Sequence, residues 1–253
     1  MKLSIIIPVK FEKRIQRTPK RLFSCLKSLN PQYQDEKDYE VIVSDLGSEK
    51  EFLEEIRNIK VYDNCYLTEN KGNRYWNRSK ALNNGIKVAK GEFIGATDLD
   101  MIFAPNFIKT VKKRMKSKVL LQCHCKFLLQ DFGEVITPEM IPKFEKAYAL
   151  AQDYSAGGFQ CAERNWFLEH PYDEDFKVWG GEDTLARDIM VEEGFTIDWI
   201  DNETSMYHLK HTHYLDVISE DERKFRGKNE SLWMTKLWLY KVNKQRGFKV
   251  VKY

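Results

Sequence analysis

A continuous apolar run near the start of the chain limits the folds open to it. Residues 3–9 read Leu-Ser-Ile-Ile-Ile-Pro-Val, with apolar side chains at odd and even positions alike. A strand of this kind is buried on both faces, as in a parallel sheet covered by helices on each side. Similar runs at 39–45, 61–67 and just before Asp98 alternate with helix-like segments. The alternation predicts an α/β fold with a mostly parallel central sheet, whose ligand site lies at the carboxyl ends of the strands.

The domain organisation follows from the absence of any break in the sequence. The 253 residues hold no internal repeat, low-complexity tract or obvious linker. We expect one domain over 1–218, with a ligand-binding part at 1–103 and a second part at 104–218, followed by a helical extension at 219–253. The extension carries Trp233, Trp238 and Tyr240 among lysines. We expect these aromatic side chains to pack against the domain, and peripheral contact with a membrane surface is the alternative.

Composition excludes several classes of protein. The net charge of +3 is too small to favour nucleic-acid binding, so we expect no nucleic-acid partner. No segment approaches the ~20 apolar residues of a membrane span, and no signal peptide is visible. The five cysteines are odd in number and scattered, which fits a reduced compartment. We expect a cytoplasmic protein, with attachment at the inner face of the membrane as the alternative.

The sequence Cys123-His124-Cys125 is a candidate zinc half-site. It lies within 119–129, which reads as one strand, so that both cysteines face one side and His124 the other. No second Cys/His pair at metal-ligand spacing follows, and buried thiols are the favoured interpretation.

Two acidic residues follow the apolar run that ends at residue 97. Asp98 and Asp100 are spaced so that a loop at the end of a strand can aim both carboxylates at one point. Carboxylates in this position suggest a divalent cation, and a cation so held usually has a phosphate on its other side. A solvated turn with two ordinary acids is the alternative.

The residues at the first two strand ends resemble a known family. Ser4-Ile-Ile-Ile-Pro-Val and Val41-Ile-Val-Ser-Asp-Leu-Gly-Ser are similar to the start of the inverting family 2 among the nucleotide-sugar glycosyltransferases of the GT-A fold. The resemblance implies that Pro8, which we expect to end the first strand, and Asp45 line a uridine pocket. The family usually has two adjacent acids before Gly-Ser, whereas this chain has Ser44 in the first position.

Asn77-Arg-Ser-Lys-Ala-Leu-Asn-Asn-Gly85 resembles a segment of the β-1,4-galactosyltransferases and of chondroitin-type polymerases. The resemblance implies that Arg78 contacts the donor diphosphate, with Lys80 as a second candidate, and a guanidinium suits phosphate oxygens. Asp98-Leu-Asp100 resembles the metal motif of the same enzymes. This implies that Asp100 binds manganese or magnesium and that Asp98 contacts the sugar nucleotide.

Trp179-Gly-Gly-Glu-Asp183 gives the most specific match. The glycines, including Gly181, let the backbone approach a sugar, and Trp179 can stack on its apolar face. The resemblance implies Asp183 as the catalytic base, with Glu182 binding acceptor or donor sugar. After this motif the family often continues with further acids, whereas this chain has Thr184-Leu185. A helix is predicted from Thr184 to Glu193.

A histidine downstream usually completes the metal site of such enzymes. Met206-Tyr207-His208 resembles the Tyr-His of the polymerase-type domains, so His208 is the favoured ligand, with His211 and His213 as alternatives.

Together with these motifs, the family resemblance implies a metal-dependent, inverting glycosyltransferase. It would transfer a hexose or N-acetylhexosamine from a UDP-sugar to a hydroxyl of a carbohydrate or lipid-linked glycan, for use in polysaccharide synthesis. A nucleotidyltransferase acting on sugar phosphates and a non-catalytic carbohydrate-binding protein are the alternatives.

Overall fold

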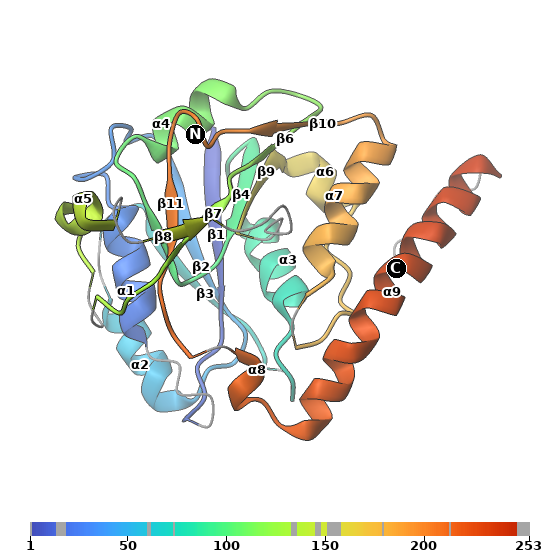
Figure 1. Cartoon of the computed structure of the whole chain (residues 1–253), viewed down its shortest axis with the longest axis horizontal. Helices are drawn as coiled ribbons and strands as arrows, with labels where there is room; N and C mark the ends of the chain where they lie inside the picture. The colour runs from blue at the N-terminus through green and yellow to red at the C-terminus, as the bar shows by residue number, and fades with distance from the viewer. Residues whose placement is uncertain are drawn as a thin grey trace.

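A computed structural model describes residues 2–13, 19–59, 62–72, 74–132, 136–144, 148–150, 158–178, 180–212 and 214–246. Its centre is a seven-stranded sheet in the order β10-β6-β9-β4-β1-β2-β3 (Figure 1). The strands are β1 (Leu3–Val9), β2 (Glu40–Asp45), β3 (Cys65–Glu69), β4 (Phe93–Thr97), β6 (Val119–Gln122), β9 (Phe159–Glu163) and β10 (Thr196–Trp199). The predicted α/β fold with a mostly parallel sheet is confirmed.

Helices cover both faces of this sheet, as the apolar runs predict. One core cluster joins Ile5 and Ile7 to side chains of three helices: α1 (Pro19–Ser28), α2 (Lys50–Asn58) and α4 (Phe107–Arg114). The other joins Ile6 to side chains of α3 (Arg78–Val88), α6 (Arg164–Glu169) and α7 (Glu182–Glu192). Because successive residues of β1 enter opposite clusters, both of its faces are fully buried.

Strand β1 continues one residue past Pro8, so the prediction that proline ends it is wrong. Pro8 pairs in register with Ser44 of β2, whereas the pairing of β1 with β4 stops at Ile6 and Ala96. The Val9 carbonyl still accepts a hydrogen bond from Leu46 on the β2 side. In a parallel strand, the N–H groups of neighbouring residues point to opposite partner strands. Val9 bonds to β2, so residue 8 faces β4, beyond the last residue pair of β1 with β4. The N–H that proline lacks therefore removes no hydrogen bond from the sheet.

Residues 119–129 do not form the single strand that was predicted. They divide into β6 and β7 (Cys125–Leu128), which belong to different sheets. At the break, the backbone N–H of His124 donates to Asp201 (2.5 Å), and the imidazole stacks on Trp199 at 3.8 Å between ring centroids. Cys123 and Cys125 are both buried and free, as the thiol interpretation expected.

A smaller four-stranded sheet, β5-β11-β7-β8, lies against the main one. Its other strands are β5 (Met101–Phe103), β8 (Tyr148–Leu150) and β11 (Met206–His208). The segment before β8 contains a short 3₁₀ helix, η2 (Pro138–Met140), and α5 (Ile141–Phe144). β11 pairs antiparallel with β5, which places His208 opposite Met101. The small sheet therefore brings the histidine segment beside the Asp98–Asp100 turn.

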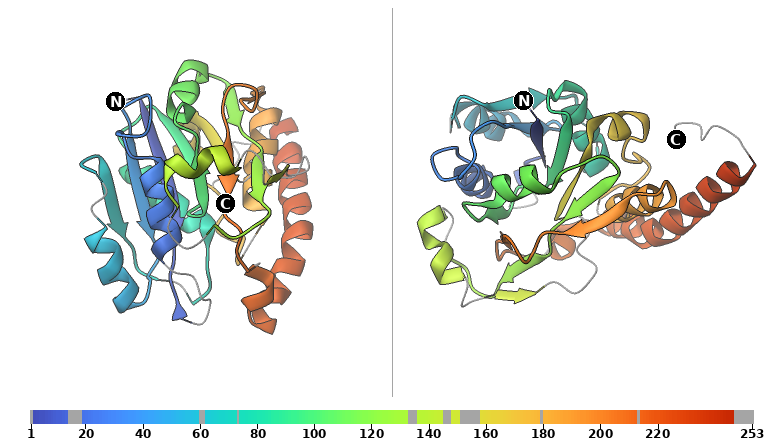
Figure 2. Two further views of the ribbon diagram at one scale, coloured as in Figure 1. Left: turned by 60° about the vertical axis from the view of Figure 1, so that its left-hand side comes forward. Right: turned by 90° about the horizontal axis from the view of Figure 1, so that it is seen from above.

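The chain continues through α8 (Tyr214–Val217) into α9 (Glu220–Gln245), which lies beside α7 (Figure 2). Ser219 and Glu222 form a capping box at the start of α9. Of the aromatic side chains expected to pack against the domain, Tyr240 is buried, whereas Trp238 is 62% exposed, so the expectation is wrong for Trp238. No helix in the described part of the chain is long and apolar enough to cross a bilayer. The division into 1–218 and 219–253 stays a prediction.

Candidate active site

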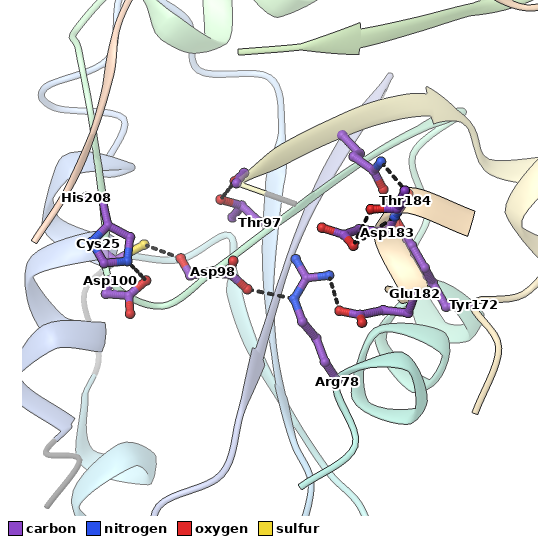
Figure 3. Close-up of polar contacts among 12 residues, drawn as sticks. Cys25, Arg78, Thr97, Asp98, Asp100, Tyr172, Glu182, Asp183, Thr184 and His208 are labelled. Atoms are coloured by element: carbon purple, nitrogen blue, oxygen red, sulfur yellow. Dashed lines mark hydrogen bonds and ion pairs between the residues drawn. The ribbon is translucent and has the colours of Figure 1, made fainter. Parts of the chain in front are cut away.

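The Asp98–Leu99–Asp100 turn joins β4 to β5 and is anchored through its backbone. The Asp100 carbonyl accepts a hydrogen bond from the Leu209 N–H (2.9 Å), and the Asp98 carbonyl lies 3.8 Å from the thiol of Cys25. The two carboxylates diverge, with Asp98 directed toward Arg78 and Asp100 toward His208 (Figure 3). The turn therefore links two clusters of polar side chains.

Arg78 is the centre of the first cluster. It is the first residue of α3, whose N-cap Asn77 accepts a hydrogen bond from the Lys80 N–H (2.8 Å). Its side chain is buried, with Nε 2.7 Å from Oδ1 of Asp98 and Nη1 3.4 Å from Oε1 of Glu182. Burial by itself lowers the pKa of Arg78, but the neighbouring carboxylates outweigh it and keep the guanidinium charged.

Glu182 and Asp183 form the first turn of α7, two residues earlier than the predicted start of that helix. Glu182 is 4% exposed, and burial together with the charge of Asp183 raises its pKa to about 7. Asp183 is half-buried and accepts a hydrogen bond from the Thr184 N–H (2.8 Å). Both carboxylates lie at the positive end of the helix dipole, with Asp183 the more accessible of the two.

A buried polar pair that the sequence interpretation missed fixes the backbone of Asp183. Gln160 of β9 donates to the Asp183 carbonyl (3.0 Å) and accepts a hydrogen bond from the Tyr172 hydroxyl (2.9 Å). Gln160 is 1% exposed. The available signal was a lone amide in an otherwise apolar strand, since a buried polar side chain needs a partner.

The second cluster consists of Asp100, His208 and His211. One ligand atom from each lies within 4.8 Å of the others. Nε2 of His211 is 3.0 Å from Asp100, and Nε2 of His208 is 3.8 Å from it. Burial lowers the pKa of His208, which favours the neutral imidazole that can bind a metal. One carboxylate and two imidazoles suit a divalent metal such as Mn²⁺.

The structure thus brings two of the three candidate histidines together with Asp100. His208 was favoured and His211 was an alternative, and both belong to the cluster. His213 lies outside the described residues. The spacing of the histidines could not separate His208 from His211, because the bend after β11 turns both toward the same aspartate.

Pro8, one residue before the end of β1, and Asp45, the last residue of β2, are both buried. The Asp45 carboxylate accepts hydrogen bonds from the N–H of Gly47 (2.9 Å) and from the N–H and hydroxyl of Ser48. Burial raises the pKa of Asp45. Gly47 has a φ of 74° and packs against Gly72, where an added Cβ would lie 2.3 Å from the Gly72 Cα. Asp45 therefore organises the turn after β2, and its contact with uridine stays a prediction.

The remaining predicted site residues are placed less completely. The side chain of Lys80 is half-buried in the first turn of α3. Gly181 is the N-cap of α7 with a φ of 104°, a conformation that favours glycine. Trp179 lies outside the described residues. Their roles toward the sugar nucleotide stay predictions.

Comparison with known proteins supplies the family. A model described as glycosyl transferase family 2 matches residues 4–162. The chain belongs to glycosyl transferase family 2. It is also similar to an uncharacterized glycosyltransferase, YfnE of Bacillus subtilis (strain 168), with 34% identity over 126 residues. That match covers 49% of this chain and 29% of YfnE, so the family 2 chain described here spans less than a third of that relative.

Solved structures with this fold include TarS 1-349 of S. aureus in complex with UDP-GlcNAc, with a TM-score of 0.59 and 18% identity over 89% of this chain and 64% of TarS. Another is the mannosyltransferase PcManGT of Pyrobaculum calidifontis in complex with GDP-Man and Mn²⁺, with a TM-score of 0.57 and 17% identity over 93% of this chain and 63% of that one. A third is GalNAc-T7 with UDP, GalNAc and Mn²⁺, with a TM-score of 0.58 and 18% identity over 85% of this chain and 45% of GalNAc-T7. Identities this low show the fold, which is GT-A.

Proposed function

We propose that this family 2 protein is a metal-dependent, inverting glycosyltransferase that uses a UDP-sugar. The observation that carries the proposal is the divergence of Asp98 and Asp100, one toward Arg78 and the other toward two histidines. A cation bound at the second cluster and a guanidinium in the first would flank the diphosphate of a sugar nucleotide. Complexes of TarS with UDP-GlcNAc and of GalNAc-T7 with UDP and Mn²⁺ support this choice of ligands.

The donor site draws on the buried Arg78. Its guanidinium is already oriented by Asp98 and Glu182, so little side-chain entropy is lost when it meets phosphate oxygens. Asp98 would then contact the ribose or the donor sugar, and Pro8 and Asp45 the uracil. Lys80, Trp179 and Gly181 complete the proposed set.

Asp100, His208 and His211 are the residues that would hold Mn²⁺ or Mg²⁺. Their mixed oxygen and nitrogen donors favour Mn²⁺ over Mg²⁺, which prefers oxygen ligands. A divalent cation there supplies charge stabilisation for the departing diphosphate.

Asp183 is the proposed base because it is the accessible carboxylate of the α7 pair. It removes the proton of an acceptor hydroxyl while that oxygen forms a bond to the anomeric carbon of the donor sugar. The bond between the anomeric carbon and the phosphate oxygen breaks at the same time, and UDP leaves on the opposite face. A single displacement of this kind inverts the configuration.

The decisive experiment measures UDP binding by calorimetry with and without Mn²⁺ and then identifies products from UDP-glucose, UDP-galactose and their N-acetylated analogues. We expect Mn²⁺-dependent UDP binding and release of UDP during transfer. Release of pyrophosphate from UTP and a sugar 1-phosphate would instead indicate a nucleotidyltransferase, and binding of glycans without UDP would indicate a carbohydrate-binding protein.

The base is tested with Asp183→Asn, for which we expect a kcat lower by about 100-fold or more, with the Kd of UDP nearly unchanged. Asp216→Asn is the matched control, since Asp216 is exposed on α8. Full turnover by Asp183→Asn at saturating donor would refute the assignment.

A further inference from the structure

The segment that leads to Glu182 and Asp183 has an unusual backbone. Val178 has a φ of 74°, Gly180 of 88° and Gly181 of 104°. Glycine adopts such angles freely, but a β-branched residue does so rarely, and the surrounding structure must hold it there. The contacts that fix Val178 therefore also fix the path of the chain into α7.

Both polar groups of the peptide unit between Lys177 and Val178 are bonded to other parts of the protein. The Val178 N–H donates to the Trp76 carbonyl (2.9 Å), two residues before Arg78. The Lys177 carbonyl accepts a hydrogen bond from Nδ2 of Asn229 on α9 (3.1 Å). One peptide plane is thus held from one side by the segment that carries Arg78 and from the other by α9.

Asn229 also lies close to Gly181, at the end of the segment that leads to Glu182. It is 3% exposed, and a Cβ added to Gly181 would lie 3.4 Å from its carbonyl oxygen and 2.6 Å from the ring of Phe176. The backbone of α9 therefore packs directly against the residue that precedes Glu182. Only glycine at position 181 allows this approach.

A second anchor lies two helical turns further along α9. Lys236 is on the same face as Asn229, because residues seven apart in a helix align. Its ammonium lies 2.7 Å from the buried Asp173 and 2.6 Å from the exposed Asp175, at the start of the segment that leads to the turn. α9 therefore holds the segment at Asp173, Lys177 and Gly181.

We propose that Asn229 is a positioning residue of the active site: through the Lys177 carbonyl it sets Glu182 and Asp183 at their distances from Arg78. The inference rests on the proposed function and extends the catalytic unit to α9, which lies outside the family match at 4–162. It assigns Asn229 no contact with substrate.

The test uses Asn229→Asp, which keeps the shape of the side chain and turns the amide donor into an acceptor facing a carbonyl. The substrate is the UDP-sugar that the wild type turns over best. We expect kcat to fall by about 10- to 100-fold, because a displacement of the catalytic carboxylates by about 1 Å causes losses of this size. The Kd of UDP in the presence of Mn²⁺ should change by less than about threefold, at a stoichiometry of one per chain. If the stoichiometry of UDP binding is unchanged, the variant is fully folded and the loss of kcat is a property of the folded enzyme.

Gln245→Glu is the control, because it makes the same chemical change at an exposed position of the same helix. Its kcat should equal that of the wild type. If Asn229→Asp does not fold, Asn229→Ala removes the donor without adding charge and is judged by the same loss of kcat.

The two levels of the proposal fail differently. Wild-type protein that binds no UDP in the presence of Mn²⁺ refutes the proposed function and this inference together. Wild-type protein that binds UDP, combined with an Asn229 variant that keeps the wild-type kcat, refutes the positioning role alone.

Discussion

Glu182→Gln should stabilise the protein in a pH-dependent way, even though it alters the proposed active site. The buried carboxyl has a pKa of about 7 in the folded state, above its ordinary value of 4.5. A carboxyl with a raised folded pKa contributes its full stability below the unfolded pKa and loses it as the pH rises through the folded pKa. The window of loss therefore runs from about pH 4.5 to 7. Glutamine has a similar shape and does not titrate.

The size of the effect follows from the same pKa values. The rise from 4.5 to about 7 corresponds to about 3 kcal/mol of lost stability above pH 7. This loss is already net of the attraction to Arg78, whose Nη1 lies 3.4 Å from the carboxylate and lowers the pKa of Glu182. We expect a stabilisation of about 2–3 kcal/mol at pH 8, which raises Tm by about 4–12 °C for a chain of this length. Near pH 5 the difference should shrink to about 0.8 kcal/mol, or about 2–3 °C in Tm.

The assay is thermal unfolding from pH 5 to pH 8 without metal or nucleotide, followed by calorimetry or circular dichroism. Glu230→Gln is the matched control, because Glu230 is exposed on α9 and its replacement should leave Tm nearly unchanged at every pH. A Tm difference for Glu182→Gln that is the same at pH 5 and pH 8, or a loss at pH 8, would refute the claim that burial suppresses ionisation of Glu182.

His211→Ala should weaken Mn²⁺ binding by at least about tenfold in calorimetric titrations, since it removes one of three clustered donors, and unchanged affinity would exclude it as a ligand. Arg78→Lys should weaken UDP binding by about 10-fold or more, because an ammonium cannot reproduce the guanidinium geometry; equal Kd values would remove it from the donor site. Lys236→Met should destabilise the fold by about 3 kcal/mol in denaturant titrations, because Asp173 stays buried without its cation. Lys241→Met, at an exposed ion pair, should cost less than about 1 kcal/mol, and equal losses for both would contradict the argument.

The fold was predictable because the spacing of apolar residues indicates each strand or helix, and the order of strands and helices along the chain indicates the fold class. The apolar runs at 3–9 and 39–45 predicted buried parallel strands, and both strands are present as β1 and β2. The direction of β9 was not predictable, because the apolar pattern of a strand is the same for parallel and antiparallel pairing. Its antiparallel pairing with β4 and β6 depends on residues far away in the sequence. The break at His124 likewise depends on Asp201, 77 residues away.

The site was predictable only where neighbours in sequence share it. The spacing of Asp98 and Asp100 and the Glu182–Asp183 pair were visible as motifs. The pairing of Arg78 with Glu182 joins residues 104 apart, and no local pattern encodes it. The same holds for Asn229, because a single amide in a polar helix gives no sign that it reaches the carbonyl of Lys177.

The position of β9 has a consequence for the order of folding. This strand fills the space between β4 and β6, pairing Gly95 with Cys161 on one side and Leu121 with Cys161 on the other. During synthesis the five strands of this sheet that precede β9 therefore emerge with two exposed ladder edges, on β4 and β6, which are prone to wrong pairing. The joining of β4 to β6 waits for residues 159–163, and long-range closure of this kind slows folding. A fragment ending before residue 158 should aggregate, however well its first strands are formed.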